Sequence, residues 1–349
     1  MSQIGIVEGF FGPSWSREAR LSFAPFLKKV GGDFYIYAPK RDAFLRKAWR
    51  ESWTPEYLDF IHELKTHFQL HGIKFGLALS PFGLGTQITN EDWQILRGKF
   101  KQLSDLKIDY LGLFFDDMPS TDKLLEVQTS VLNLASEYFE AGLIFCPRYY
   151  SLDPILDKVF GPRPDHYVES LSTSIPSSIE ICWTGPKVIS EEISSDHLSL
   201  VHSLLGRRPF IWENLFANDG PKNCKFLKLR SFTGRDKSFL KDTSGVGFNL
   251  MNQAYLSQLL YLSSLYVLKQ DMDPDQAFAK SCKDLCSNQL AEFILENRLT
   301  FLNQGLDKID PETKAKYLSK LSEEGSLLAL EIASWLKGEF IVGPECLTD

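Results

Sequence analysis

Residues 110–119 read Tyr-Leu-Gly-Leu-Phe-Phe-Asp-Asp-Met-Pro, an apolar run that ends in two adjacent carboxylates. Seven other short apolar or β-branched runs recur along the chain, spaced so that one helix and two loops fit between neighbours, as a βαβ unit requires. The eight runs cover residues 4–7, 34–37, 75–79, 110–115, 143–146, 180–183, 210–212 and 245–250. Eight strands that alternate with helices predict an α/β fold, a parallel sheet closed into a (β/α)8 TIM barrel.

Polar, glycine or proline residues follow each predicted strand. They are Glu8-Gly9, Pro39-Lys40, Ser80-Pro81, Asp116-Asp117, Arg148-Tyr149-Tyr150, Thr184-Gly185-Pro186, Glu213-Asn214 and Asn249 to Asn252. In an α/β barrel the carboxyl ends of the strands converge on one face, where active sites are built. The sequence therefore predicts a catalytic rim at this face.

The strand pattern stops near residue 270. Asp273-Pro274 begins a helical stretch that continues to Asn303, and Asp310-Pro311 begins another that continues to Lys337. We therefore predict a catalytic barrel domain over residues 1–270 and a C-terminal α-helical bundle over residues 271–349.

Composition excludes several classes of protein. Hydrophobic residues make up 44% of the chain and charged residues 24%, which is typical of globular proteins and not of disordered ones. The net charge is −7, without a basic stripe, so neither nucleic acid nor an anionic membrane surface is an expected partner. The six cysteines are dispersed and the N-terminus lacks a secretory signal pattern, which favours a cytoplasmic location.

The carboxylate pair Asp116 and Asp117 is the strongest candidate for chemistry. Two close carboxylates do not both ionise easily, so the pKa of one is raised, and such a pair suits general acid–base catalysis. Two other interpretations remain open at this point. One aspartate caps the following helix while the other is solvated, or the pair binds a divalent metal ion. No further cluster of Asp, Glu or His at the other strand ends supports the metal site.

The other rim side chains suit a neutral, hydroxyl-rich ligand. Polar side chains can bind hydroxyl groups, and indole rings offer flat faces on which a sugar can stack. The polar candidates are Lys40, Tyr150, Asn214 and Asp219, and the indoles are Trp183 and Trp212. Each alone also fits a purely structural role, with the tryptophans in the core and Lys40 at the surface.

Six motifs occur together and in order. They are Val7-Glu-Gly-Phe-Phe-Gly12, Tyr37-Ala-Pro-Lys40, Phe115-Asp-Asp117, Cys146-Pro147, Trp183-Thr-Gly-Pro-Lys-Val188 and Ile211-Trp-Glu-Asn-Leu-Phe-Ala-Asn-Asp219. With these motifs the chain resembles, over residues 3–270, the catalytic domain of glycoside hydrolase family 84. That family comprises protein O-GlcNAcases and bacterial β-N-acetylglucosaminidases.

The resemblance implies a (β/α)8 barrel that hydrolyses β-linked N-acetylglucosamine with retention of configuration, without a metal or other cofactor. It implies substrate-assisted catalysis, in which the acetamido oxygen of the substrate is the nucleophile and an oxazoline forms. Asp116 matches the residue that accepts a hydrogen bond from the acetamido N–H. Asp117 matches the general acid that protonates the leaving oxygen and later activates water.

The resemblance also implies a set of substrate-binding residues. Contacts to the sugar are expected from Gly9, Lys40, Asn214 and Asp219, with Tyr150 and Trp212 at the acetamido pocket and Asn252 after the last strand. Asn249 is the alternative to Asn252. The chain departs from the family pattern at Phe11, where Tyr is frequent, and at Leu250, where bacterial members often have Pro. Both departures put only local contacts in doubt.

Two alternative functions remain. One is an N-acetylhexosamine-binding protein without hydrolytic activity, which the presence of both aspartates disfavours. The other is a hexosaminidase that acts on peptidoglycan or hyaluronan fragments. The sequence leaves the aglycone undetermined, and it leaves the oligomeric state open, with a homo-oligomer among the options.

Overall fold

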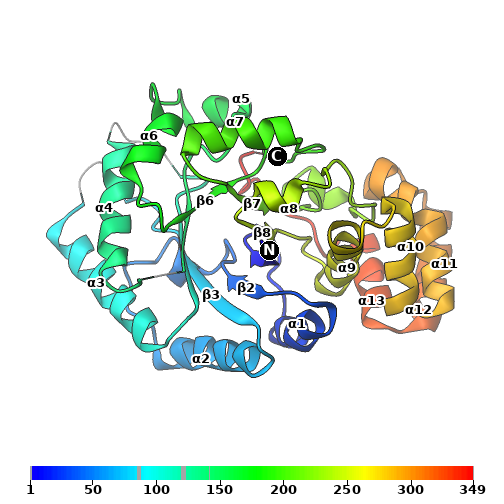
Figure 1. Ribbon diagram of the computed structural model, residues 1–349. Coiled ribbons are helices and arrows are strands. Elements are labelled where there is room, and N and C mark those ends of the chain that lie inside the picture. The colour runs from blue at the N-terminus through cyan, green and yellow to red at the C-terminus, as the bar shows by residue number, and fades with distance from the viewer. Residues whose placement is uncertain (1, 85–87, 119–122, 141, 349) are drawn as a thin grey trace.

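The structure is a computed structural model that describes residues 2–84, 88–118, 123–140 and 142–348. Eight parallel strands close into a barrel in the order β1 to β8 (Figure 1). The strands are β1 (Gln3–Glu8), β2 (Phe34–Tyr37), β3 (Lys74–Leu79), β4 (Tyr110–Phe114), β5 (Leu143–Cys146), β6 (Glu180–Trp183), β7 (Phe210–Glu213) and β8 (Gly245–Phe248). The predicted (β/α)8 barrel is confirmed.

The strands are short, and most of their residues are buried. Gly5 of β1 pairs with Phe34 of β2 on one side and with Gly247 of β8 on the other, which closes the sheet. Side chains fill the inside of such a barrel and helices cover its outside, so both faces of each strand exclude water. This is why the strands appear in the sequence as nearly continuous apolar runs.

Helices surround the barrel. They are α1 (Arg17–Val30), α2 (Pro55–Leu70), α3 (Asn90–Asp105), α4 (Leu124–Ser136), α5 (Pro154–Phe160), α6 (Tyr167–Ser174), α7 (Ser195–Leu205), α8 (Phe239–Asp242) and α9 (Ala254–Gln270). Side-chain caps fix where several of them begin. Thr54 accepts the backbone N–H of Tyr57 before α2, and Thr89 and Asp92 form a reciprocal capping box at α3.

Further helices pack beside α9 at one side of the barrel (Figure 1). They are α10 (Pro274–Leu285), α11 (Asn288–Leu299), α12 (Pro311–Glu324) and α13 (Leu327–Leu336). Each predicted helical stretch is therefore a pair of helices. Ser287 caps α11 and Ser326 caps α13, and these caps start a new helix where the sequence pattern alone predicts continuity.

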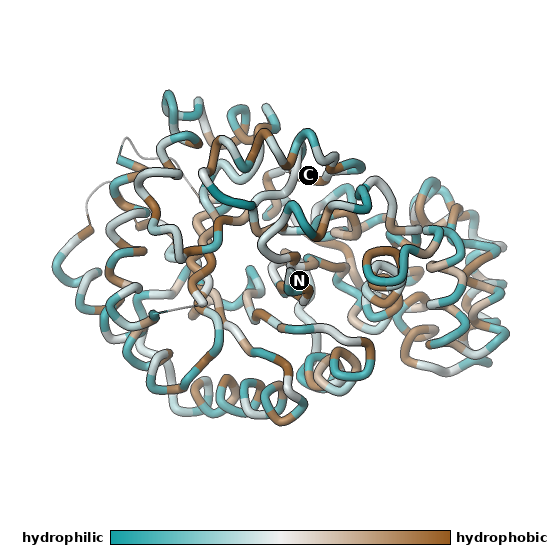
Figure 2. The backbone as a smooth tube through the Cα atoms, viewed as in Figure 1, coloured by the Kyte–Doolittle hydropathy of each residue, from teal (hydrophilic) through white to brown (hydrophobic). Residues whose placement is uncertain are grey.

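Hydropathy follows this architecture. Hydrophobic residues run along the strands, while hydrophilic residues are frequent on the outer sides of the surrounding helices (Figure 2). Among the described residues, no helix combines the length and the apolar character that crossing a membrane requires.

A buried ion pair ties β1 to α1 beneath the rim. Arg20 donates to Glu8 through Nε at 2.8 Å and through Nη2 at 2.7 Å, and the Glu8 side chain is fully buried. The hydroxyl of Tyr35 on β2 donates to the same carboxylate. Because a buried charge without a partner is costly, removal of one member destabilises the fold more than removal of an exposed charge.

We expect Arg20→Met to lower the free energy of unfolding by about 3–5 kcal/mol, since it removes the cation that pairs with the buried Glu8 carboxyl group. Chemical denaturation measures this. Arg17→Met, which breaks the exposed pair between Arg17 and Glu63, is the matched control and should have little effect. Adding Glu8→Gln to Arg20→Met should restore part of the loss. Equal stability of the Arg20 and Arg17 variants would contradict this account of the ion pair.

Candidate active site

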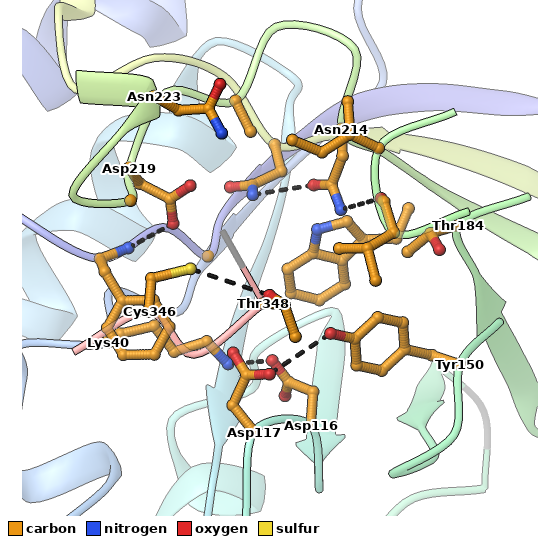
Figure 3. A pocket seen from close by; sticks show the side chains of 18 of the residues that line it. Lys40, Asp116, Asp117, Tyr150, Thr184, Asn214, Asp219, Asn223, Cys346 and Thr348 are labelled. Atoms are coloured by element: carbon orange, nitrogen blue, oxygen red, sulfur yellow. Dashed lines mark hydrogen bonds and ion pairs between the residues drawn. The ribbon is translucent and has the colours of Figure 1, made fainter. Parts of the chain in front are cut away.

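The carboxylate pair lies where β4 ends. After Phe114 the strand leaves the sheet, and Asp117 adopts a left-handed backbone conformation with φ +52°. A regular strand would send neighbouring side chains to opposite faces. The turn instead lets both Asp116 and Asp117 line one cavity (Figure 3). Left-handed backbone is uncommon outside glycine and is tolerated best by Asn and Asp.

Asp116 is held by a buried ion pair. Lys40, which follows β2, donates from Nζ to Oδ2 of Asp116, and the two side chains are only 2% and 8% exposed. The other carboxylate oxygen, Oδ1, is buried and has no hydrogen-bond partner among the described residues. Asp116 therefore has one oxygen available to accept a hydrogen bond from a ligand.

Asp117 is poised to hold a proton. Burial and the neighbouring charge of Asp116 raise the pKa of Asp117 to about 6, while Lys40 and Arg46 oppose this rise. The hydroxyl of Tyr150 donates to Oδ1 of Asp117 across a long 3.3 Å contact. Below about pH 6 Asp117 is therefore protonated beside the ion-paired Asp116, an arrangement that suits an acid–base catalyst.

Arg46 is a residue that the sequence analysis missed. Its Nη2 donates to the backbone carbonyl oxygen of Asp117 at 2.7 Å. Its guanidinium carbon lies 5.6 Å from the ring centre of Phe11 and 5.1 Å from that of Phe82. Its Nη1 is buried without a hydrogen-bond partner in the part of the chain that the structure describes. Arg46 thus braces the turn at Asp117 and adds a positive charge beside it. Arg46 lies near Arg41, Lys47 and Arg50 in the sequence, so its residue type alone does not single it out.

The cavity is lined by residues at or just beyond the carboxyl ends of β1, β2, β4, β5, β6, β7 and β8. Two further lining residues come from the C-terminal segment (Figure 3). Of the predicted site residues, it brings together Gly9, Lys40, Asp116, Asp117, Tyr150, Trp212, Asn214 and Asp219. Gly9 is required by close packing, because a Cβ there would lie 2.3 Å from Cζ2 of Trp212. Trp183, by contrast, is fully buried and donates to His197, so its role is structural.

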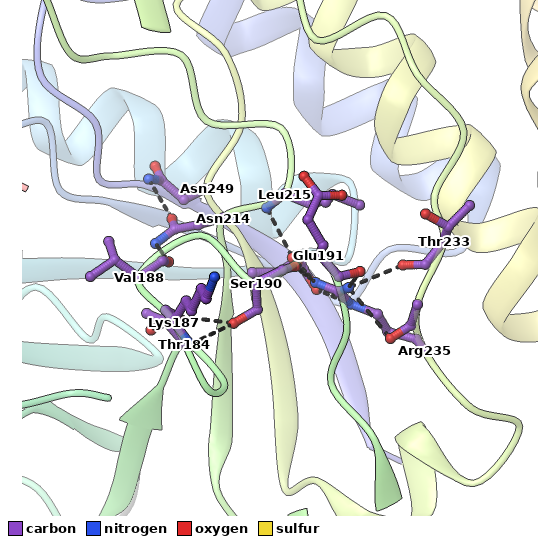
Figure 4. Close-up of polar contacts among 12 residues, drawn as sticks. Thr184, Lys187, Val188, Ser190, Glu191, Asn214, Leu215, Thr233, Arg235 and Asn249 are labelled. Carbon is purple, nitrogen blue, oxygen red and sulfur yellow. Dashed lines mark hydrogen bonds and ion pairs between the residues drawn. The ribbon is translucent and has the colours of Figure 1, made fainter. Parts of the chain in front are cut away.

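The last strand contributes Asn249, and Asn252 lies outside the cavity lining. The amide of Asn252 donates to the carbonyl oxygens of Phe11 and Pro13, so it fastens the loop after β1. The amide of Asn249 donates to Oδ1 of Asn214 at 3.0 Å, as Figure 4 shows. Of the two, Asn249 is the one that lines the cavity, so it is the better placed to contact a ligand. The sequence could not decide which of the two asparagines lines the cavity, because this depends on the path of the loop after β8.

The loop after β7 is braced from both ends. Arg235 pairs with Glu213 at 2.7 Å, both side chains being almost fully buried, and also donates to the carbonyl oxygens of Ser190 and Glu191 (Figure 4). Further along the loop, Asp219 accepts the backbone N–H of Phe11 at 2.8 Å. These contacts fix Asn214 and Asp219 at the cavity wall.

The two open interpretations of the aspartate pair can be compared with the structure. Helix α4 begins after Lys123 without a side-chain cap, so neither aspartate caps it. Over the described ranges, no three His, Cys, Asp or Glu side chains lie together as a metal-binding group.

A family model described as beta-N-acetylglucosaminidase matches residues 4–296, most of the chain. The chain belongs to this family of glycoside hydrolases. The match confirms the resemblance that the six motifs indicate.

Relatives of known name agree with the family assignment. Protein O-GlcNAcase of Rattus norvegicus and that of Mus musculus are each 28% identical to the chain over 347 residues, which is 95% of this chain and 36% of the relative. The chain thus spans about a third of the length of these relatives. The solved structure of an O-GlcNAc hydrolase mutant from Thermobaculum terrenum superposes with a TM-score of 0.79 at 25% identity, covering 96% of this chain and 80% of that one.

Some lining residues have no role in the sequence-based predictions. Thr184, which belongs to the motif after β6, lines the cavity and donates to the carbonyl oxygen of Lys187. Cys346 and Thr348 also line it, although they follow the last strand by almost a hundred residues. Only the three-dimensional path of the C-terminal segment reveals these two.

The raised pKa of Asp117 makes a prediction about stability. Folding favours the protonated form, so the free energy of unfolding falls as the pH rises from about 4 to about 6. We expect Asp117→Asn to raise the free energy of unfolding at pH 7 by about 1–3 kcal/mol, because Asn has no charge to bury and tolerates the left-handed backbone.

The increase in the free energy of unfolding caused by Asp117→Asn should disappear below pH 4, where wild-type Asp117 is protonated whether the chain is folded or unfolded. Urea unfolding of both proteins at pH 4 and pH 7 measures this difference. Asp105→Asn, at an exposed helix end, serves as the control and should show no such pH dependence. A stabilisation of equal size at both pH values would contradict the burial of a titrating carboxyl at residue 117.

Proposed function

We propose that the protein is a retaining β-N-acetylglucosaminidase of the O-GlcNAcase type that hydrolyses terminal β-linked N-acetylglucosamine. The observation that carries this proposal is the adjacent pair Asp116 and Asp117, one ion-paired and the other with a raised pKa, at the end of β4 in a chain of this family. The proteins named O-GlcNAcase and O-GlcNAc hydrolase among its relatives support the choice of substrate.

In the proposed first step the acetamido oxygen of the substrate attacks the anomeric carbon and forms an oxazoline. Asp116 accepts a hydrogen bond from the acetamido N–H through its free Oδ1, which orients the group and increases its nucleophilicity. The ion pair with Lys40 fixes the orientation of Asp116. Substrate-assisted enzymes are an exception to the scheme in which a second carboxylate is the nucleophile.

Asp117 is the proposed general acid and base. Its proton passes to the glycosidic oxygen as the bond to the aglycone breaks, and the resulting carboxylate then takes a proton from the water that opens the oxazoline. A pKa of about 6 suits both roles near neutral pH. Tyr150 donates to Asp117 and stays protonated because burial and that carboxylate raise its own pKa.

The remaining lining residues are proposed to bind the sugar. Asn214 and Asp219 are held rigidly enough to bind hydroxyl groups, and Asn249 presents a buried Oδ1 without a partner among the described residues. Trp212, wedged against Gly9, forms an apolar wall. We also propose a cytoplasmic location, supported by six cysteines that are all free.

Hydrolysis of an aryl β-N-acetylglucosaminide in the presence of EDTA tests the function. We expect turnover of this substrate and none of the matching aryl β-glucoside, which lacks the acetamido nucleophile. Asp116→Asn and Asp117→Asn should each lower kcat/KM by about 10²–10⁴-fold. The Asp117 variant should lose least on substrates with good leaving groups, since these need little protonation.

Equal activity on the plain glucoside would contradict the proposed mechanism. Binding of N-acetylglucosamine without any hydrolysis would instead indicate the sugar-binding protein considered above.

Arg46 yields a separate prediction about pH dependence. Its positive charge lowers the pKa of Asp117, so Arg46→Met should move the basic limb of the pH–kcat/KM profile upward by about one pH unit. Arg46→Lys keeps the charge and should leave that limb in place while kcat falls, because the contact to the Asp117 carbonyl is weakened.

Arg50→Gln removes a nearby partly exposed charge that pairs with Asp92 and is the control for unspecific electrostatic effects. If the Arg46→Met and Arg50→Gln profiles coincide with that of the wild type, Arg46 does not tune the general acid.

A further inference from the structure

The C-terminal segment returns from the helical bundle to the barrel rim. After α13, the backbone N–H of Val342 contacts Sγ of Cys224 at 3.5 Å, and the buried Val342 side chain packs where a Cβ on Gly12 would clash. The indole N–H of Trp335 donates to the carbonyl oxygen of the same Cys224 at 3.0 Å. These contacts anchor the chain as far as residue 342.

Beyond this anchor the segment enters the cavity. Cys346 and Thr348 are part of its lining, whereas Leu347 between them is 53% exposed. In Figure 3 the Thr348 side chain lies in the middle of the cavity, between the Asp116–Asp117 pair and Asn214. The segment thus occupies the centre of the same group of side chains to which the sugar is assigned.

The position of Thr348 decides whether a sugar can enter the cavity. Its side chain lies among Asp116, Asp117 and Asn214, the residues to which the sugar is assigned. Because two groups of atoms cannot fill the same space, sugar and segment cannot occupy this part of the cavity together.

We propose that residues 343–348 are an intrachain competitor for the sugar site, so that binding of N-acetylglucosamine and insertion of this segment exclude each other. This inference rests on the proposed function for the identity of the ligand. The enzyme is then autoinhibited, because its apparent affinity for substrate is reduced by the fraction of molecules in which the site is open.

The contacts in the cavity favour displacement by a ligand. With the segment in place, Oδ1 of Asp116 and Oδ1 of Asn249 are buried without a hydrogen-bond partner in the described part of the chain. A buried polar atom without a partner is destabilising. Cys346 and Thr348 meanwhile contact each other, 3.8 Å apart, within the segment. A sugar that offers an N–H and hydroxyl groups can donate hydrogen bonds to these two oxygen atoms, which the segment does not.

Two variants should release the segment. In a chain that ends at Val342 the anchor is kept and the competitor is absent. Cys346→Asp places a carboxylate near Asp117 and Asp219, whose charges already act on the Cys346 thiol, and repulsion should expel the segment from an intact chain. Leu347→Ala alters the exposed residue of the same segment and is the matched control.

We expect both release variants to lower KM for an aryl β-N-acetylglucosaminide about tenfold or more at nearly unchanged kcat, because the catalytic groups are untouched. Leu347→Ala should behave as the wild type. An unchanged or higher KM in the chain ending at Val342, with the fold intact by circular dichroism, would overturn the proposal.

Thiol labelling tests the same competition without turnover. Burial and the Asp219 and Asp117 charges raise the pKa of the Cys346 thiol, so inserted Cys346 should react slowly. In a Cys286→Ser background, which removes the other partly exposed cysteine, N-acetylglucosamine should accelerate labelling of Cys346. Slower or unchanged labelling with sugar bound would contradict displacement.

Calorimetry with N-acetylglucosamine distinguishes a failure of the proposed function from a failure of the proposed competition by residues 343–348. Tighter binding to the chain ending at Val342 than to the full chain supports competition even if neither hydrolyses the glycoside. If both chains bind the sugar with equal affinity, the competition is contradicted while the proposed function is not. Sugar that binds neither chain contradicts the proposed function and the competition together.

Discussion

The site depends on one buried ion pair between Lys40 and the first of two neighbouring carboxylates, Asp116. Lys40 pairs with Asp116 in a place where neither side chain meets much water. Burial raises the pKa of Asp117 to about 6, and the neighbouring charge of Asp116 adds to this rise. The two aspartates therefore differ in their surroundings, because the ion pair with Lys40 belongs to Asp116.

The barrel brings Lys40 close to the two aspartates. Lys40 follows β2 and the aspartates follow β4, and only the convergence of parallel strand ends places them together. The turn after β4 then brings two consecutive side chains into one cavity. Arg46 secures that turn through the carbonyl oxygen of Asp117, and Arg235 secures the opposite wall through Glu213. Charge and backbone conformation are thus fixed by the same few contacts.

Much of this could be predicted from the sequence, because the relevant signals are local. Apolar runs such as Leu143–Cys146 mark the strands, and their polar ends mark the rim. Other features depend on contacts between residues distant in the sequence. Arg46 belongs to the site only through the folded path of its loop, Asn249 and Asn252 are told apart only by where the loop after β8 turns, and Thr348 reaches the cavity only because α13 leads back toward the barrel. No periodicity or spacing encodes such contacts.

Cys224 gives the helical bundle a mechanical connection to the catalytic face. It lies in the loop after β7, which also carries Asp219, and it contacts both Trp335 of α13 and the backbone of Val342. A displacement of α13 therefore pulls on the loop that carries Asp219, and by thermodynamic reciprocity whatever repositions this loop changes the stability of the helices beyond the barrel.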